Sequence, residues 1–144
     1  MRMSLPCPVA RPGAPGGGGH TSARPGATPC RDAPRACVAA RTPLVSGAAI
    51  RYEGQLAVFT DYDNQPCYRC IYEEADESLE DCQGNGVFSP VPGFIGVAMA
   101  GAVMKLVAGL PVHAGELALY DAITEEWRRI RLKKRADCPV CAGR

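Results

Sequence analysis

Cys67-Tyr68-Arg69-Cys70 and Cys138-Pro139-Val140-Cys141 each place two cysteines three positions apart. A turn of this kind directs two sulfurs at one ion, and two such turns complete the tetrahedral thiolate set of a structural zinc. A site with four protein ligands leaves no position for water or substrate, so the metal would hold the fold rather than do chemistry. Because residues 71–137 separate the pairs, a whole domain segment must fold back to unite them, and we expect zinc to clamp it.

Two other interpretations of these cysteines need to be weighed. A Cys-x-x-Cys pair can be a redox motif, and eight cysteines could form a disulfide framework. A redox motif has no use for the second pair. Met1–Ala10 lacks the apolar core of a signal peptide because Pro6 and Pro8 interrupt it. We therefore expect a cytoplasmic protein with reduced cysteines, and zinc is the favoured interpretation.

Composition separates the chain into two unlike segments. The 144 residues are 47% hydrophobic with a net charge of +1, which allows one modest core and gives no indication of nucleic-acid binding. Residues 1–30 contain six prolines and six glycines and few large apolar side chains. Such a segment cannot bury enough surface to offset its ordering entropy. We expect a disordered leader over residues 1–35 and a folded part over 36–144.

Two strands are predicted in the first half of the folded part. Leu44–Ile50 is apolar with light interruption, and Gln55–Thr60 follows a turn predicted around Glu53-Gly54. Turn-forming residues 61–66 then lead to Cys67.

Val87–Met104 carries no charge and is long enough to raise the question of a membrane span. Several prolines and glycines interrupt it, so we expect no membrane span. A helix from Pro90 or Pro92 to about Ala108, buried on most faces, is the better interpretation. Glu116–Asp121 and Trp127–Lys133 are then predicted strands joined by a turn.

No catalytic centre is visible from motifs alone. No Gly-x-Gly-x-x-Gly follows a predicted strand, and no Walker-type phosphate loop occurs. The two histidines, His20 and His113, suggest no Ser/His/Asp set, and His113 is expected to be a surface residue.

Several motifs, in order, carry a resemblance to a known family over about residues 36–144. From Pro43 to Gln55 the sequence closely resembles the HesA/MoeB/ThiF family of ubiquitin-activating-like adenylyltransferases. The likeness continues through Gln65-Pro66-Cys67-Tyr68-Arg69-Cys70, Cys82-x-x-x-Gly86-Val87, Pro90-x-x-Gly93-x-Ile95-Gly96, Tyr120-Asp121-Ala122 and Asp137-Cys138-Pro139-Val140-Cys141.

The resemblance implies an α/β fold: the C-terminal part of a Rossmann-like activating domain, with a mixed sheet, a buried helix and the zinc clamp. It implies an activity that uses ATP and magnesium to adenylate the C-terminal glycine of a ubiquitin-like sulfur carrier protein, in molybdenum cofactor or thiamine biosynthesis. Members of the family are typically homodimers, and their two cysteine pairs bind zinc in many cases.

The chain also departs from the family pattern. The glycine-rich loop and the residues that hold ATP and magnesium should precede residue 36, and Arg31-Asp32-Ala33-Pro34 does not reproduce the family's magnesium-binding motif. We expect a truncated or frameshifted coding region, with an out-of-frame leader and an inactive chain. The alternative function is a zinc-stabilised, non-catalytic module for carrier docking or dimerisation.

Cys82 is the candidate catalytic residue. It stands where some family members carry a cysteine that forms a covalent intermediate with the activated carrier. A cysteine near backbone amides at a helix entrance can have a lowered pKa, whereas Glu80 and Asp81 would oppose the thiolate. A nucleophile and a bystander thiol are the two interpretations of Cys82.

Overall fold

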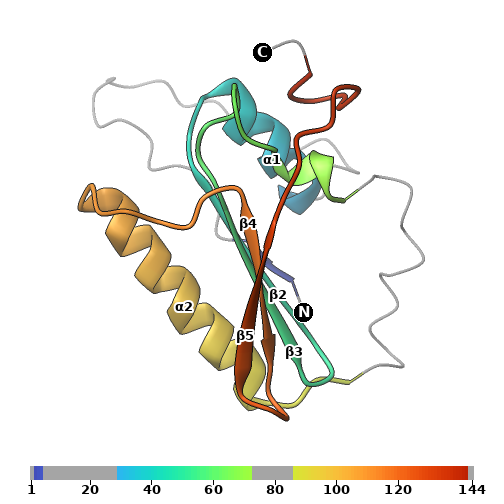
Figure 1. Cartoon of the computed structure of the whole chain (residues 1–144), viewed down its shortest axis with the longest axis vertical. Coiled ribbons are helices and arrows are strands. Elements are labelled where there is room, and N and C mark those ends of the chain that lie inside the picture. Colours follow the sequence, from blue (N-terminus) through green and yellow to red (C-terminus); the bar gives the residue numbers. More distant parts are fainter. Residues whose placement is uncertain (1, 5–28, 73–85, 143–144) are drawn as a thin grey trace, which may run out of the picture.

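The computed structural model describes residues 2–4, 29–72 and 86–142. Its described strands form one five-stranded sheet in the order β1-β2-β3-β4-β5 (Figure 1). The elements, in chain order, are β1 (Arg2–Ser4), α1 (Pro29–Ala39), β2 (Leu44–Ile50), β3 (Glu53–Phe59), the short 3-10 helix η1 (Tyr68–Cys70), α2 (Pro90–Val107), β4 (Glu116–Asp121) and β5 (Glu126–Arg131).

The predicted strand Leu44–Ile50 is confirmed as β2, but the turn that follows it was misplaced. Ile50 pairs with Glu53, so Arg51 and Tyr52 form a two-residue hairpin loop, and Arg51 adopts a positive φ of 51°. Tight hairpins favour such backbone angles. Glu53 and Gly54, expected to form the turn, are the first residues of β3.

Gly54 is needed for packing rather than for a turn. A Cβ atom built on Gly54 would lie 2.5 Å from Cδ1 of Ile95, a residue of α2. On the neighbouring strand, a Cβ on Gly47 would meet the side chain of Met99. The two glycines therefore let α2 lie close to the sheet, as small residues do at tight packing contacts.

The described ladders are all antiparallel, so the expectation of a mixed sheet is wrong for these strands. Between described residues, parallel pairing is limited to two isolated bridges, Arg51 with Val87 and Val58 with Ala114. These bridges explain the direction of β4. The chain enters α2 beside the β2–β3 loop and leaves it near the other end of β3, where Gly115 N donates to Val58 O at 3.0 Å. The next strand must therefore run back, antiparallel to β3 (Figure 1).

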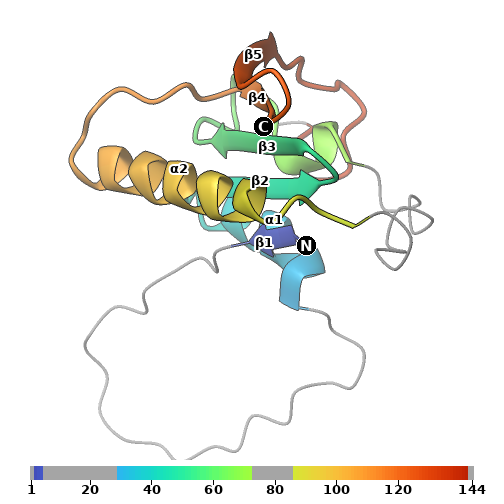
Figure 2. The same ribbon diagram turned by 90° about the horizontal axis from the view of Figure 1, so that it is seen from below.

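Each face of the sheet packs against different elements. On one face, Val45, Ala49 and Val58 form a core with the buried side of α2. On the other face, Leu44, Ala57 and Phe59 pack with residues of α1 and with the cysteine pairs. Figure 2 shows α2 along one side of β2 and β3. The sheet thus separates the two helices.

The predicted helix from Pro90 is confirmed as α2, but it is not buried on most faces. Its buried residues are Val91, Ile95 and Met99, which recur at every fourth position and form one stripe. Only 17% of its 18-residue window is buried. With a mean hydropathy of 1.6, α2 is long and apolar enough to cross a membrane. Core helices of soluble proteins can have the same length and composition. The absence of a membrane span stays a prediction.

Other expectations can be compared with the described residues. The strand Glu116–Asp121 is confirmed as β4. The strand predicted over Trp127–Lys133 is observed as β5, which begins one residue earlier and ends two residues earlier. In the loop between them, the Asp121 carboxylate accepts a hydrogen bond from the Ile123 N–H at 2.8 Å. Two described elements, β1 and the start of α1, fall within residues 1–35, where we expected a disordered leader. Residues 5–28 lie outside the described residues.

Candidate metal centre

The first cysteine pair follows a turn organised by one aspartate. The Asp61 carboxylate accepts the backbone N–H groups of Asp63 and Asn64 at 3.1 and 3.2 Å, and the Asn64 amide at 2.8 Å. These hydrogen bonds, the Asn64 side chain's foremost, hold the pKa of Asp61 below its usual value. The turn redirects the chain from β3 into η1, where Cys70 N donates to Cys67 O at 3.0 Å. Both sulfurs are thereby turned to the same side.

The second pair follows β5 and is tied back to the Asp61 turn. The Lys134 ammonium donates to the backbone oxygens of Tyr62 and Asp63 at 2.9 and 2.7 Å. A tight turn then brings Ala142 N within 3.0 Å of Cys138 O. The two cysteine pairs, each of which forms a short turn or knuckle, therefore meet although 71 positions separate Cys67 from Cys138.

The four sulfurs form a compact cluster. They all lie within 4.8 Å of one another. Three of the separations are 3.7 Å for Cys67 to Cys138, 3.4 Å for Cys70 to Cys141 and 4.0 Å for Cys67 to Cys70. A tetrahedral zinc with bonds of about 2.3 Å requires sulfur separations of about 3.8 Å. The cysteines are free thiols, and their spacing is far beyond a disulfide bond of about 2.05 Å. The cluster fits one metal ion.

The cluster is enclosed in the core on the α1 face of the sheet. Cys67, Cys138 and Cys141 are each at most 1% exposed, and Phe59 packs edge-on against Tyr68 of η1 with ring centroids 6.2 Å apart. Cys70 is the one partly exposed member of the cluster. The donor set and its burial suit a structural ion with four protein ligands.

Burial within the cluster opposes ionisation of two of its thiols. Burial raises the pKa of the Cys67 thiol well above its usual value and raises that of Cys141 to about 11. Burial acts in the same sense on Cys138, but backbone hydrogen bonds from Cys141 and Val140 outweigh it and lower its pKa to about 7. Metal binding would therefore have to displace the thiol protons of Cys67 and Cys141, and a divalent cation would stabilise the resulting thiolates.

The structure brings Cys67, Cys70, Cys138 and Cys141 together as the sequence predicted. Cys82, the candidate nucleophile, lies outside the described residues. His113 is an exposed residue whose Nδ1 lies 3.4 Å from the Glu116 carboxylate.

Two supporting residues were not predicted. Nothing in the sequence distinguishes Lys134 from the adjacent Lys133, so its tie to the Asp61 turn could not be foreseen. Cys37 is 1% exposed and packs in the same core, but it is not among the clustered thiols.

The model of the ThiF family matches residues 31–140, which run from α1 to the second cysteine pair. The chain belongs to the ThiF family. The chain is 41% identical over 108 residues to the sulfur carrier protein ThiS adenylyltransferase of Escherichia coli. This alignment covers 75% of this chain and 43% of that relative.

Other ThiF-family relatives agree. The molybdopterin-synthase adenylyltransferase of Escherichia coli is 44% identical over 106 residues, covering 73% of this chain and 43% of the relative. The mouse adenylyltransferase and sulfurtransferase MOCS3 is 44% identical over 110 residues, covering 74% and 24%. The chain thus spans less than half the length of these relatives. Among solved structures, Escherichia coli MccB with ATP superimposes with a TM-score of 0.61 at 16% identity, covering 76% of this chain and 34% of that one. This likeness concerns the fold alone.

Proposed function

We propose that this chain supplies the zinc-bearing portion of an ATP-dependent adenylyltransferase that activates the C-terminus of a ubiquitin-like sulfur carrier protein. The observation that supports this most strongly is the 41–44% identity to relatives named as adenylyltransferases for ThiS and for molybdopterin synthase. The family match over residues 31–140 supports the same proposal. The activated carrier would then deliver sulfur for the biosynthesis of thiamine or of the molybdenum cofactor.

In this reaction the carrier's C-terminal carboxylate attacks the α-phosphorus of ATP. Pyrophosphate leaves, and the product is an acyl-adenylate that a sulfur nucleophile can open. Magnesium would neutralise charge on the phosphates. The 144 residues contain no Gly-x-Gly-x-x-Gly or Walker-type loop after a predicted strand, so we expect the chain by itself to show no ATP–pyrophosphate exchange.

Zinc has a structural part in this proposal. The metal would join η1, which follows β3, to the turn that follows β5, and so fix the two ends of the antiparallel strands. The carrier's activated end would then be handled elsewhere, because three of the four cysteines are buried and a metal with four thiolate ligands has no open position.

A chimera tests the function. Residues 36–144 would replace the matching portion of the Escherichia coli molybdopterin-synthase adenylyltransferase, and carrier-dependent ATP–pyrophosphate exchange would be measured. We expect exchange above that of a matched chimera carrying Cys67→Ser and Cys138→Ser. A folded, zinc-loaded chimera that binds ATP and carrier but gives no exchange would contradict the proposal.

We also propose that the intact protein is a homodimer in which the outward face of α2 is covered. Val97, Met104 and Val107 on this helix are 74%, 73% and 85% exposed. No charged residue occurs in α2 before Lys105, although surface helices normally carry charges on the outer side. An apolar surface of this kind is typical of an interface.

A further inference from the structure

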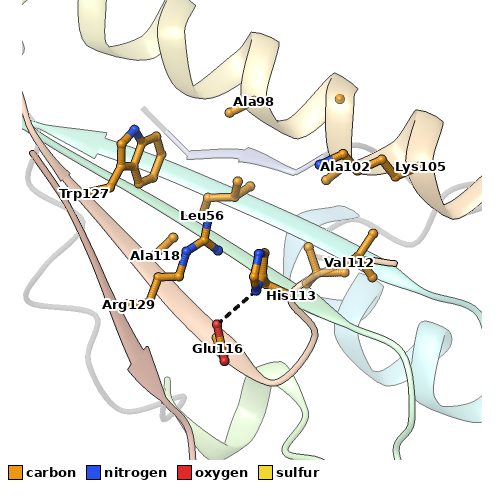
Figure 3. A pocket seen from close by; sticks show the side chains of 12 residues that line it. Leu56, Ala98, Ala102, Lys105, Val112, His113, Glu116, Ala118, Trp127 and Arg129 are labelled. Atoms are coloured by element: carbon orange, nitrogen blue, oxygen red, sulfur yellow. Dashed lines mark ion pairs between the residues drawn. The ribbon is translucent and has the colours of Figure 1, made fainter. Parts of the chain in front are cut away.

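A groove lies on the α2 face of the sheet, away from the cysteine cluster. Its volume is about 410 Å³, at the small end of the range of roughly 300–1,000 Å³ found for ligand pockets. It is bounded by α2 on one side and by β3, β4 and β5 on the other (Figure 3).

The groove exists because the residues that line it on α2 are small. Ala98, Gly101 and Ala102 leave space above Leu56, a residue of β3. Nothing lies within 4 Å of the position where Gly101 would carry a Cβ. Trp127 on β5 supplies an aromatic wall (Figure 3). Such a lining suits an apolar chain or ring.

The charged groups of the groove do not balance. Lys105 comes from α2 and Arg129 from β5, and among the described residues neither has a hydrogen-bond or ion-pair partner. The only carboxylate in the lining belongs to Glu116, which already faces His113 at 3.4 Å. Figure 3 shows Lys105 extending along the helix side and Arg129 rising toward Leu56. An anionic group on a ligand would therefore find two unpaired cations.

We propose that this groove binds a small apolar carboxylate, such as a medium-chain acid. The apolar part would lie between α2 and Leu56 and against Trp127, and the carboxylate would face Arg129 and Lys105. A guanidinium matches a carboxylate because its N–H groups form a planar fork. The site goes beyond the proposed adenylylation, since it uses the opposite face of the sheet from the cysteines.

Three probes of equal length separate charge from apolar contact. Octanoate, octan-1-ol and octylamine would be titrated into the full zinc-loaded chain, with the fluorescence of Trp127, the single tryptophan, as readout. We expect octanoate to bind at least ten-fold more tightly than octylamine, with octan-1-ol between them.

Two variants and a control locate the site. Arg129→Gln should weaken octanoate binding about ten-fold and leave octan-1-ol unchanged. Arg128→Gln, at the preceding position of β5 and on the other face of the sheet, should change neither. Gly101→Leu should fill the groove and abolish binding of both probes, with unchanged zinc content as the check on folding. Equal affinity for octanoate and octylamine, or equal losses in the two arginine variants, would overturn the proposal.

Discussion

Cys67 and Cys138 lie 3.7 Å apart although 71 positions separate them in the chain. Two buried thiols at this distance stabilise the fold little by themselves. Burial raises the pKa of Cys67 and so opposes its ionisation. A zinc ion held by the four cysteines would supply the missing stabilisation. Structural zinc can contribute on the order of 10 kcal/mol in small metal-dependent domains, comparable to the net stability of about 5–15 kcal/mol of a whole domain.

Replacing one ligand should therefore cost both metal and fold. Cys138→Ser is expected to lower zinc from about one ion per chain to well under one, and to lower the thermal midpoint. The matched control is Cys37→Ser, which changes an equally buried cysteine outside the cluster. Metal analysis by mass spectrometry checks the stoichiometry. Full zinc retention in Cys138→Ser, or equal loss in Cys37→Ser, would show that the cluster is not the site.

Gly54 gives a second prediction for a single residue. In Gly54→Ala the new methyl group would overlap Ile95, with Cδ1 and Cγ1 at 2.5 and 2.6 Å, and we expect a loss of ~1–3 kcal/mol in the free energy of unfolding. Gly96→Ala, where nothing lies within 4 Å, should instead stabilise the helix by ~0.5–1 kcal/mol. Urea denaturation at fixed zinc concentration measures both. Equal effects would mean that α2 does not dock closely on β3.

Among the elements, the segment after β5 is tied to the Asp61 turn by one side chain. Lys134 joins it to the Asp61 turn through two backbone oxygens. In Lys134→Met these carbonyls lose their donor, so the second knuckle should be held less firmly and zinc should transfer to a chelator several-fold faster. Lys133→Met is the control. Identical transfer rates in the two variants would contradict this role.

The elements also show what could be predicted from sequence. Apolar or uncharged runs placed β2 and α2 close to their observed bounds, because burial pattern and length are local properties. The β2–β3 turn was misplaced because Gly54 resembles a turn residue, whereas its role is contact with Ile95, which lies far along the chain. The direction of β4 depends on where α2 begins and ends along β3, and no local sequence pattern shows this.

Of the candidate site, too, one part could be predicted from the sequence and another could not. Spacing alone was enough to group the four cysteines, since thiols at such positions have one well-known structural use. Lys134 and the groove behind Trp127 could not be found from spacing, because they depend on which surfaces the fold brings together.

In the whole molecule, the outward face of α2 is an exposed apolar surface that we propose a second copy covers. If a second copy covers it, placing a charge there should prevent association. Val97→Glu with Met104→Glu is expected to convert dimers to monomers in sedimentation velocity, because burying unpaired carboxylates is costly. A charge reversal on the other face of the sheet, Arg128→Glu, is the control. A chain that sediments as a monomer before any substitution would refute the dimer.

One zinc ion is expected to join the two cysteine pairs and so to fix this part of the ThiF fold. Zinc K-edge X-ray absorption on the purified, metal-loaded chain measures the ligands of that ion. Four sulfur ligands at about 2.3 Å are expected. A coordination shell with only two sulfurs, completed by nitrogen or oxygen, would show that the two pairs do not share one ion.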